Sequence, residues 1–475
     1  GAKWHTSHGD WGEFDADDFI GTAEMVTKEG SIHTASGHIR RVILCDKCQL
    51  EKLDSHTIQL TRPGPSVEIT WHSRQPEGSA LAFHSIDHFE ATGEEAAGLQ
   101  SVGTGPWELI EAQSGLVRKM KAVNDHWRKT PEWEEMWWQE IAEESTRLAN
   151  FETGQVDTGS FNSDSIQALK QKNLPDVRFK VFPGANSAYL NILGQIYNPE
   201  HPAHHPTADK PARVPIGEEV AYTARCQELV YVSCDRDVNS AEWQRALKVR
   251  QAMAMSIDRQ KLVNNLAFGE GAPYYVYAWL GHGTRAQQFG LDKLQWEYNP
   301  EKAKQLLAEA GVGDGFEIEF ALPLRPGAAG AIVAGEAVAT MWEEIGIKSN
   351  LTKLPMSEYR GGFVRRTNIG VNAHNGGAPI EPLRSYSSLM NSANSLNFGF
   401  EHPDFQAPLE AAGSLTDDER WGQLAEMATF VFENVVNIPL YTENSVWPLG
   451  PNLGEWEPLN RNYQWLSNWE AAPHR

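Results

Sequence analysis

The stretch that decides the fold is residues 249–263, VRQAMAMSIDRQKLV. It predicts a helix with Arg250 near its start, an interruption at Ile-Asp-Arg, and a second helical run. Residues 298–316, YNPEKAKQLLAEAGVGDGF, follow shortly afterwards. Their asparagine cap, their proline in the first turn and their closing glycine are the start and stop signals of a further helix.

The residues that follow alternate between strand and helix patterns. FEIEFALP (316–323) and IKSNLTKLP (347–355) predict strands, and GEAVATMWEEIG (335–346) between them predicts an amphipathic helix. This order predicts an α/β lobe with a largely parallel sheet. Earlier in the chain, STRLANFETGQVDTGSF (145–161) predicts a helix that ends at Gly154 and then a strand.

Length and charge limit the class of protein. The chain has 475 residues, which suggests two or three domains, and a formal net charge of −22. Such acidity argues against nucleic acids and anionic membrane surfaces as partners, since both attract clustered Lys and Arg. The sequence contains no run of 18 or more apolar residues, so it predicts no transmembrane helix. The first residues lack the pattern of a signal peptide, so we expect that any export signal was removed or preceded this chain.

The four cysteines form two local pairs, Cys45 with Cys48 and Cys226 with Cys234. Two disulfides, which fit an oxidising compartment, or inert thiols are the favoured interpretation. A four-cysteine zinc site would require the two pairs to meet in space, and redox catalysis would require a C-x-x-C at a helix start.

Three common motifs of enzyme active sites are absent from the sequence. It contains no G-x-S-x-G, H-E-x-x-H or G-x-x-x-x-G-K-[ST]. A glycosidase needs two carboxyl groups at a defined separation, which the sequence does not give. His201, His204 and His205 in EHPAHHP could bind nickel or zinc, but the prolines between them favour a solvated loop.

Six motifs follow one another along the chain: AKWHTSHGDWGEFDADDF (2–19), VGTGPWEL (102–109), RLANFETGQVD (147–157), VRQAMAMSIDRQKLV (249–263), YNPEKAKQLLAEAGVGDGF (298–316) and NIPLY (437–441). They resemble motifs of family 5 extracellular solute-binding proteins, the dipeptide, oligopeptide and nickel receptors of ABC importers. Each motif alone is weak, but six in the right order, from Trp4 to Tyr441, are specific.

The resemblance implies a two-lobed α/β periplasmic-binding-protein fold, or flytrap, with an additional subdomain on the first lobe. The implied boundaries are 1–103 for the additional subdomain, 104–191 and 438–475 for the rest of lobe I, and 192–437 for lobe II. The chain would cross between the lobes near Asn191 and Ile438.

The sequence departs from the family pattern in two places. Family members normally have a further stretch before the W-H-D-G signature, whereas this sequence begins at the signature. We expect that those first strands precede this chain or are supplied by another. Peptide-binding members also carry G-W-x-x-D-Y-x-x-P, whose Asp pairs with the peptide's amino group. In AHNGGAPIEPLRSY (373–386), Asn375 takes the Trp position and Ala378 the Asp position, so this amine anchor is missing.

The same stretch supplies the candidate ligand-binding residues Asn375, Gly376 and Gly377. The glycines let a ligand approach the backbone, and the amide both donates and accepts; a plain turn is the alternative. Arg384 is a candidate for a ligand carboxylate and Glu381 for an amine or a hydroxyl. A surface salt bridge and a turn cap are their alternative roles.

The 17 tryptophans raise the alternative of a carbohydrate ligand, because flat aromatic faces pack on sugar rings. Trp279 and Trp447 are the candidates, since the resemblance places them near expected cleft loops. Packing in the core of a lobe is the commoner role of such residues.

Together these features predict the solute-binding subunit of an ABC importer, which delivers a short peptide to a membrane permease without catalysis. An oligosaccharide receptor, a receptor that reports to a sensor and a secreted glycoside hydrolase are the alternatives. We expect a monomer without cofactor or metal, in the periplasm or outside the cell. An N-terminal anchor absent from this chain could hold it at the membrane.

Overall fold

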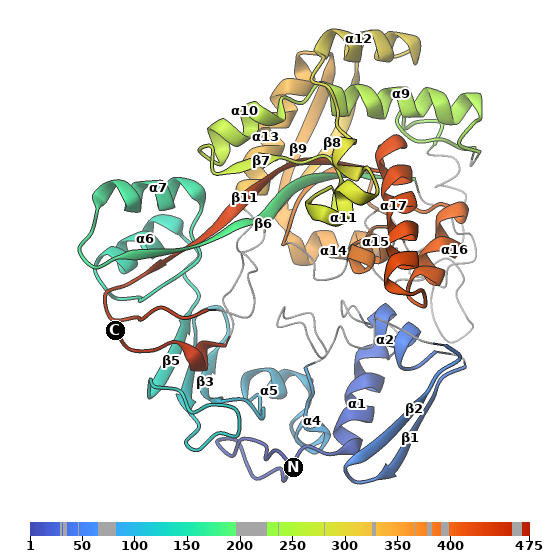
Figure 1. Ribbon diagram of the computed structural model, residues 1–475. Helices are drawn as coiled ribbons and strands as arrows, with labels where there is room; N and C mark the ends of the chain where they lie inside the picture. The colour runs from blue at the N-terminus through green and yellow to red at the C-terminus, as the bar shows by residue number, and fades with distance from the viewer. Residues whose placement is uncertain are drawn as a thin grey trace. The chain divides into compact units, whose positions relative to one another are not determined.

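The computed structural model divides the chain into two compact units. Unit 1 comprises Gly1–Val181 and Val446–Arg475, and unit 2 comprises Phe182–Ser445. The structure describes all residues except 29–30, 32–35, 46, 65–81, 196–225, 236, 280, 325–328, 366, 378–381, 391–398 and 458–467. Figure 1 shows both units, with unit 1 built from the blue and teal elements and the last red segment.

Several helices of unit 1 begin at a side-chain cap. Those described are α1 (Ala16–Thr27), α2 (Ser36–Val42), α4 (Ile86–Thr92), α5 (Glu94–Leu99), α6 (Glu144–Glu152), α7 (Ser163–Lys172) and the 3₁₀ helix η3 (Trp469–Ala471). At the start of α1, the Asp15 carboxylate accepts from the N–H groups of Asp17 and Asp18, and the Asp18 side chain accepts from the Asp15 N–H. The Trp4 indole donates to the same Asp18 side chain at 3.1 Å, which fixes the first sequence motif against α1.

The strands of unit 1 form two antiparallel sheets. β1 (Gln49–Asp54) pairs with β2 (Thr57–Thr61), and β3 (Trp107–Gln113), β4 (Val117–Ala122) and β5 (Glu135–Gln139) form a three-stranded meander.

The prediction of a strand after Gly154 is wrong. Only an isolated bridge forms there, between Thr158 and Leu449, because Asn162 already caps α7 a few residues later and leaves no room for a ladder.

Unit 2 contains the helices predicted from the two central segments. Its described helices are α9 (Ala241–Met255), α10 (Arg259–Leu266), η1 (Tyr277–Trp279), α11 (Gly283–Gln288), η2 (Leu291–Lys293), α12 (Pro300–Glu309), α13 (Ala329–Glu343), α14 (Met356–Arg365), α15 (Pro382–Met390), α16 (Pro403–Ala412) and α17 (Asp417–Glu433). The predicted interruption separates α9 from α10, where Asp258 caps the second helix. Asn299 caps α12, and Gly311 follows that helix with φ 80°. None of the helices in the described part of the chain combines the length and the apolar character that a bilayer crossing requires.

A six-stranded sheet forms the centre of unit 2. Its strands are β6 (Arg178–Leu193), β7 (Gly271–Pro273), β8 (Phe316–Leu324), β9 (Ile347–Pro355), β10 (Gly370–Gly377) and β11 (Asn437–Leu449), in the order β7-β11-β6-β10-β8-β9. The expectation of a largely parallel sheet holds only for β10, β8 and β9. These strands are joined through crossover helices, whereas β6 pairs antiparallel with β10 and β7 antiparallel with β11.

Strands β6 and β11 carry the chain across the boundary between the units. The boundary falls between Val181 and Phe182 in β6 and between Ser445 and Val446 in β11, and both strands continue through it. Asn191 and Ile438, where the sequence places the crossings, lie in these same two strands.

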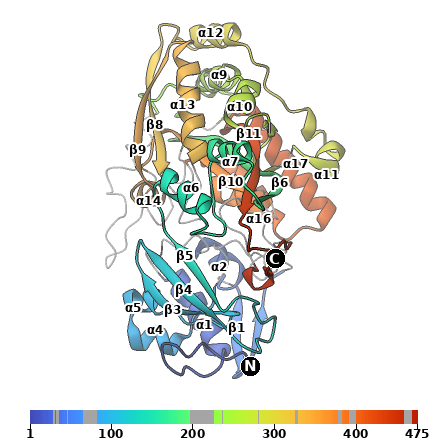
Figure 2. The same cartoon turned by 90° about the vertical axis from the view of Figure 1, so that its left-hand side faces the viewer.

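Helix α13 covers one face of the sheet in unit 2 (Figure 2). It approaches closely because Gly335 has no side chain: a Cβ there would lie 2.5 Å from Leu322 Cδ2 and 3.1 Å from Ala373 Cβ. Trp342 of the same helix donates to the Met253 carbonyl of α9 at 3.0 Å, within the core.

Two buried arginines of the opening segment hold the start of β11. Arg250 donates from Nε to the Asn434 carbonyl at 2.9 Å, and Arg259 donates from Nε to the Pro439 carbonyl at 2.9 Å. Burial lowers the pKa of Arg250 to about 9 and that of Arg259 to about 10. Both guanidinium groups therefore fix the backbone of the returning strand at the cost of burying a cation.

Candidate functional site

The predicted residues Asn375, Gly376 and Gly377 form the end of β10, so they belong to a strand and not to a plain turn. β6 pairs with them in register, with Ser187 opposite Gly376 and Asn186 opposite Gly377. The Ser187 hydroxyl donates to the Gly376 carbonyl at 3.2 Å. The Asn186 side chain is 8% exposed, and its Oδ1 has no hydrogen-bond partner. These paired strand ends therefore carry amides and a hydroxyl instead of charges. Asn375 is 7% exposed, and Gly376 and Gly377 are half-buried.

The first turn of α13 lies beside two further polar side chains, Tyr441 and Glu443 of β11. A Cβ on Gly330 of that turn would lie 3.3 Å from Glu443 Oε1 and 3.9 Å from the Tyr441 hydroxyl. Burial raises the pKa of Tyr441 well above its usual value, and the charge of Glu443 raises it further. The positive end of the helix dipole favours the carboxylate at this place. Sequence reasoning missed both residues, although the alternation in NIPLYTENS predicts that they share one face.

The same strand ends rest on an aromatic cluster. Tyr189 of β6 and His374 of β10 are cross-strand partners whose rings stack at 5.1 Å with an interplanar angle of 27°. Tyr277 of η1 contacts Tyr189 edge-on, also at 5.1 Å, and burial raises its pKa. A Cβ on Gly376 would lie 3.4 Å from Tyr189 Cε1, so this ring supports the glycine from one side. The cluster gives the strand ends a rigid base.

The other predicted ligand-binding residues lie elsewhere or outside the described part of the chain. Trp447 is 5% exposed and belongs to the part of β11 within unit 1, whereas the strand ends that carry Asn375 belong to unit 2. Trp279 lies in η1 and Arg384 in α15, but their side chains are outside the description, and Glu381 is outside it entirely. The histidines at 201, 204 and 205 also lie outside the described residues.

All four cysteines are disulfide-bonded, Cys45 to Cys48 in unit 1 and Cys226 to Cys234 in unit 2. The Glu242 carboxylate lies within 4.8 Å of both sulfurs of the second pair and accepts from the Cys234 N–H at 2.7 Å. Zinc requires thiolate sulfur, and the sulfurs of this group are already bonded to each other. The disulfide therefore accounts for the group without a metal.

The loop closed by Cys226 and Cys234 anchors the other end of β10. The Tyr231 hydroxyl accepts from the Gly370 N–H at 2.9 Å, at the first residue of the strand. Ser233 and Gln195 exchange two buried hydrogen bonds of 2.9 and 3.0 Å, which tie the loop to the residues after β6. The loop thus fixes the pair of strands whose far ends carry the candidate residues.

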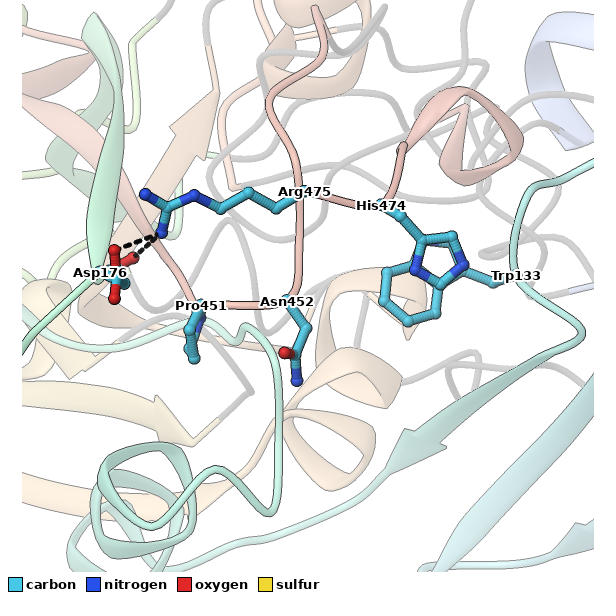
Figure 3. Close-up of a pocket in the computed structure, with 6 residues that line it drawn as sticks. All are labelled: Trp133, Asp176, Pro451, Asn452, His474 and Arg475. Atoms are coloured by element: carbon cyan, nitrogen blue, oxygen red, sulfur yellow. Dashed lines mark hydrogen bonds and ion pairs between the residues drawn. The ribbon is translucent and has the colours of Figure 1, made fainter.

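Unit 1 contains a separate open cavity of about 560 Å³ (Figure 3). Its lining residues are Trp133, Asp176, Pro451, Asn452, His474 and Arg475. The rings of Trp133 and His474 lie 3.7 Å apart, and Arg475 forms a 2.8 Å ion pair with Asp176. None of these residues was predicted to bind a ligand, and both members of the ion pair are largely exposed.

One protein family matches most of the chain. The sequence model described as "Bacterial extracellular solute-binding proteins, family 5 Middle" matches residues 1–397.

Curated relatives include two binding proteins of different ligands. The heme-binding protein A of Haemophilus influenzae is 24% identical over 420 residues, which cover 85% of this chain and 66% of that protein. The dipeptide-binding protein of Escherichia coli is 22% identical over 355 residues, which cover 73% of this chain and 56% of that protein. The chain therefore spans less than two thirds of the length of these relatives.

Solved structures share the fold over the whole chain. A dipeptide-binding protein from Pseudoalteromonas sp. SM9913, in complex with Met-Leu, superposes with a TM-score of 0.74 at 17% identity and covers 100% of this chain and 86% of its own. The periplasmic binding protein DppA from Helicobacter pylori, in complex with the peptide STSA, gives a TM-score of 0.73 at 16% identity, with coverages of 99% and 84%. At these identities the likeness concerns the fold alone.

Proposed function

Because the chain belongs to the bacterial extracellular solute-binding proteins of family 5, we propose that it is the solute-binding subunit of an ABC importer and that its ligand is a short peptide. The family match over residues 1–397 is the observation that carries this proposal. The family expected from the six motifs is confirmed, and so is the two-lobed α/β fold, which the peptide-bound relatives share.

The ends of β6 and β10 are suited to the polar backbone of a peptide. A peptide offers alternating N–H and C=O groups, and the carboxamide of Asn375 provides both a donor and an acceptor. Gly376 and Gly377 are half-buried and have no side chains, so a ligand strand can approach their backbone, and the aromatic cluster behind Gly376 holds it in place. We assign ligand contacts to these three residues and to Glu381 and Arg384.

Ligand capture in such a receptor is a shift of population. A ligand that makes more contacts in a closed form than in an open one stabilises the closed form by that difference. Some relatives are named as periplasmic binding proteins of ABC transporters, and the proposed action makes and breaks no covalent bond. The closed form would then dock on a membrane permease as a monomer, which light scattering coupled to gel filtration would test.

Family members are periplasmic or extracellular, and we place this protein in the same compartments. The two disulfides support that placement because such bonds persist in oxidising surroundings.

Native mass spectrometry of protein purified from its host tests the proposed ligand. A retained adduct whose mass matches a short peptide is the expected result, and hexose increments would contradict it. Thermal unfolding with a dipeptide library provides the second measurement, since a true ligand raises the Tm without being converted. Turnover of a chromogenic glycoside would instead identify a hydrolase.

A further inference from the structure

Two asparagines face each other in the core of unit 2. Asn191 of β6 and Asn372 of β10 are register partners in the antiparallel pair that Figure 2 labels, and each is 0% exposed. Opposite residues of an antiparallel pair project to the same face of the sheet. Both amide atoms of each side chain lack a hydrogen-bond partner. Four polar atoms therefore lie together, fully buried and unpaired.

The neighbouring pairs on this face form no hydrogen bond with the side chains of the two asparagines. On one side, His374 Nδ1 lies 2.7 Å from the Asn375 carbonyl, and its partner Tyr189 forms a side-chain hydrogen bond with Tyr277. On the other side, Leu193 stands opposite Gly370, which has no side chain. Buried amides in native proteins are nearly always paired, with protein groups or with ordered water.

We infer that Asn191 and Asn372 form a buried hydration site in which ordered water bridges the two carboxamides. Each carboxamide carries donors and an acceptor, so a water molecule between them can bond to both in either orientation. The two side chains are uncharged, which suits water better than an ion. Internal water of this kind satisfies the amides and keeps β6 and β10 in one register, because a slip by one residue would move them to the other face.

An isosteric pair of variants tests whether the site contains bound water. Thr and Val have nearly the same shape, so Asn372→Thr and Asn372→Val differ mainly by one hydroxyl. We expect the Tm of Asn372→Thr to exceed that of Asn372→Val by about 2–4 °C, because the hydroxyl can bond to the water and to the remaining amide. A Val variant as stable as the Thr variant, or more stable, would overturn the inference.

The same strand offers a matched control. Val371 is 0% exposed and, as the adjacent residue, projects to the opposite face, where Ala373 lies against Gly335 of α13. Its register partners Ile192 and Phe320 are apolar, so an added hydroxyl finds no side-chain partner among them, and we expect Val371→Thr to lower the Tm. We therefore expect Thr to give the higher Tm at position 372, where water is bound, and Val to give the higher Tm at position 371, where the face is apolar.

A crystal structure of the unmodified protein at about 1.8 Å or better separates water from a direct contact. Density for water within hydrogen-bond distance of both carboxamides is the expected result. Side chains turned to bond directly to each other, with no water between them, would overturn the inference even if the Thr variant were the more stable.

Discussion

Replacing Arg250 by lysine tests whether the guanidinium fork, and not merely its charge, holds the start of β11. Arg250 donates to the Asn434 carbonyl at 2.9 Å and to the Tyr231 carbonyl at 2.8 Å, and it lies 5.1 Å from the Trp243 ring. A lysine ammonium can reach at most one of the two carbonyls. One lost charge-assisted bond costs about 1.5–3 kcal/mol, and the lost stacking about 0.5–2 kcal/mol. We expect Arg250→Lys to lower the free energy of unfolding by about 2–5 kcal/mol.

Replacing Arg250 by methionine should destabilise the protein no more than replacing it by lysine. This variant loses both hydrogen bonds and the stacking on Trp243, about 3.5–8 kcal/mol together, but it also removes a buried cation. Burial lowers the pKa of Arg250 from 12.5 to about 9, which corresponds to about 5 kcal/mol against the charged form. The two effects nearly offset, so the methionine variant should be at least as stable as the lysine variant.

Urea unfolding, followed by tryptophan fluorescence and circular dichroism, gives the free energies for this comparison. Arg285→Lys is the matched control, because Arg285 pairs with Asp417 and Asp418 at the surface and should change stability by no more than about 0.5 kcal/mol. The reasoning fails if Arg250→Lys matches the unmodified protein while Arg250→Met is strongly destabilised.

Three further predictions concern pH, redox state and ligand. The His5 ring accepts from the Gly103 N–H at 3.2 Å, and burial lowers its pKa. The unfolded chain therefore takes up the proton first, so thermal stability should fall as the pH drops below about 6.5, and less steeply in His5→Gln. Reduction of Cys226–Cys234 should raise hydrogen exchange of the amide bonded to the Tyr231 hydroxyl by about tenfold, whereas unchanged exchange would show that the loop holds without its disulfide. Asn375→Leu should weaken binding of the ligand found by native mass spectrometry by about tenfold or more in calorimetry; equal affinity would remove Asn375 from the site.

Several helices could be predicted because their signals are local. Asp15 before α1 and Asn299 before α12 cap helices through hydrogen bonds to backbone within three residues. Such contacts are contained in a short window of sequence, so neither the rest of the chain nor the order of the sheet alters them. The strand wrongly expected after Gly154 shows the limit, since a strand needs a partner that a short window does not contain.

The partners of the candidate site could not be predicted for the same reason. Ser187 donates a hydrogen bond to Gly376, 189 residues away in the sequence, and neither stretch of sequence indicates its partner. The antiparallel pairing of β6 with β10 also depends on which strands enter and leave unit 2. Alternation predicts which side chains share a face within one strand, but register between strands is set by the whole sheet.

The contrast between positions 378 and 443 bears on which ligands to try. The resemblance to the family motif predicts Ala378 at the position where peptide receptors carry an acidic residue, and this prediction argues against a ligand amine. The structure offers a different carboxylate, that of Glu443 in β11. The Gly184 N–H donates to Asn444 Oδ1 at 3.0 Å, so β11 brings Glu443 close to the end of β6 that pairs with Gly377. A carboxylate beside these strand ends can attract an ammonium group even without the acidic residue of the motif. Peptides with a free amino terminus therefore belong in the first ligand screen, together with their acetylated counterparts, and equal binding of both forms would exclude Glu443 as an amine anchor.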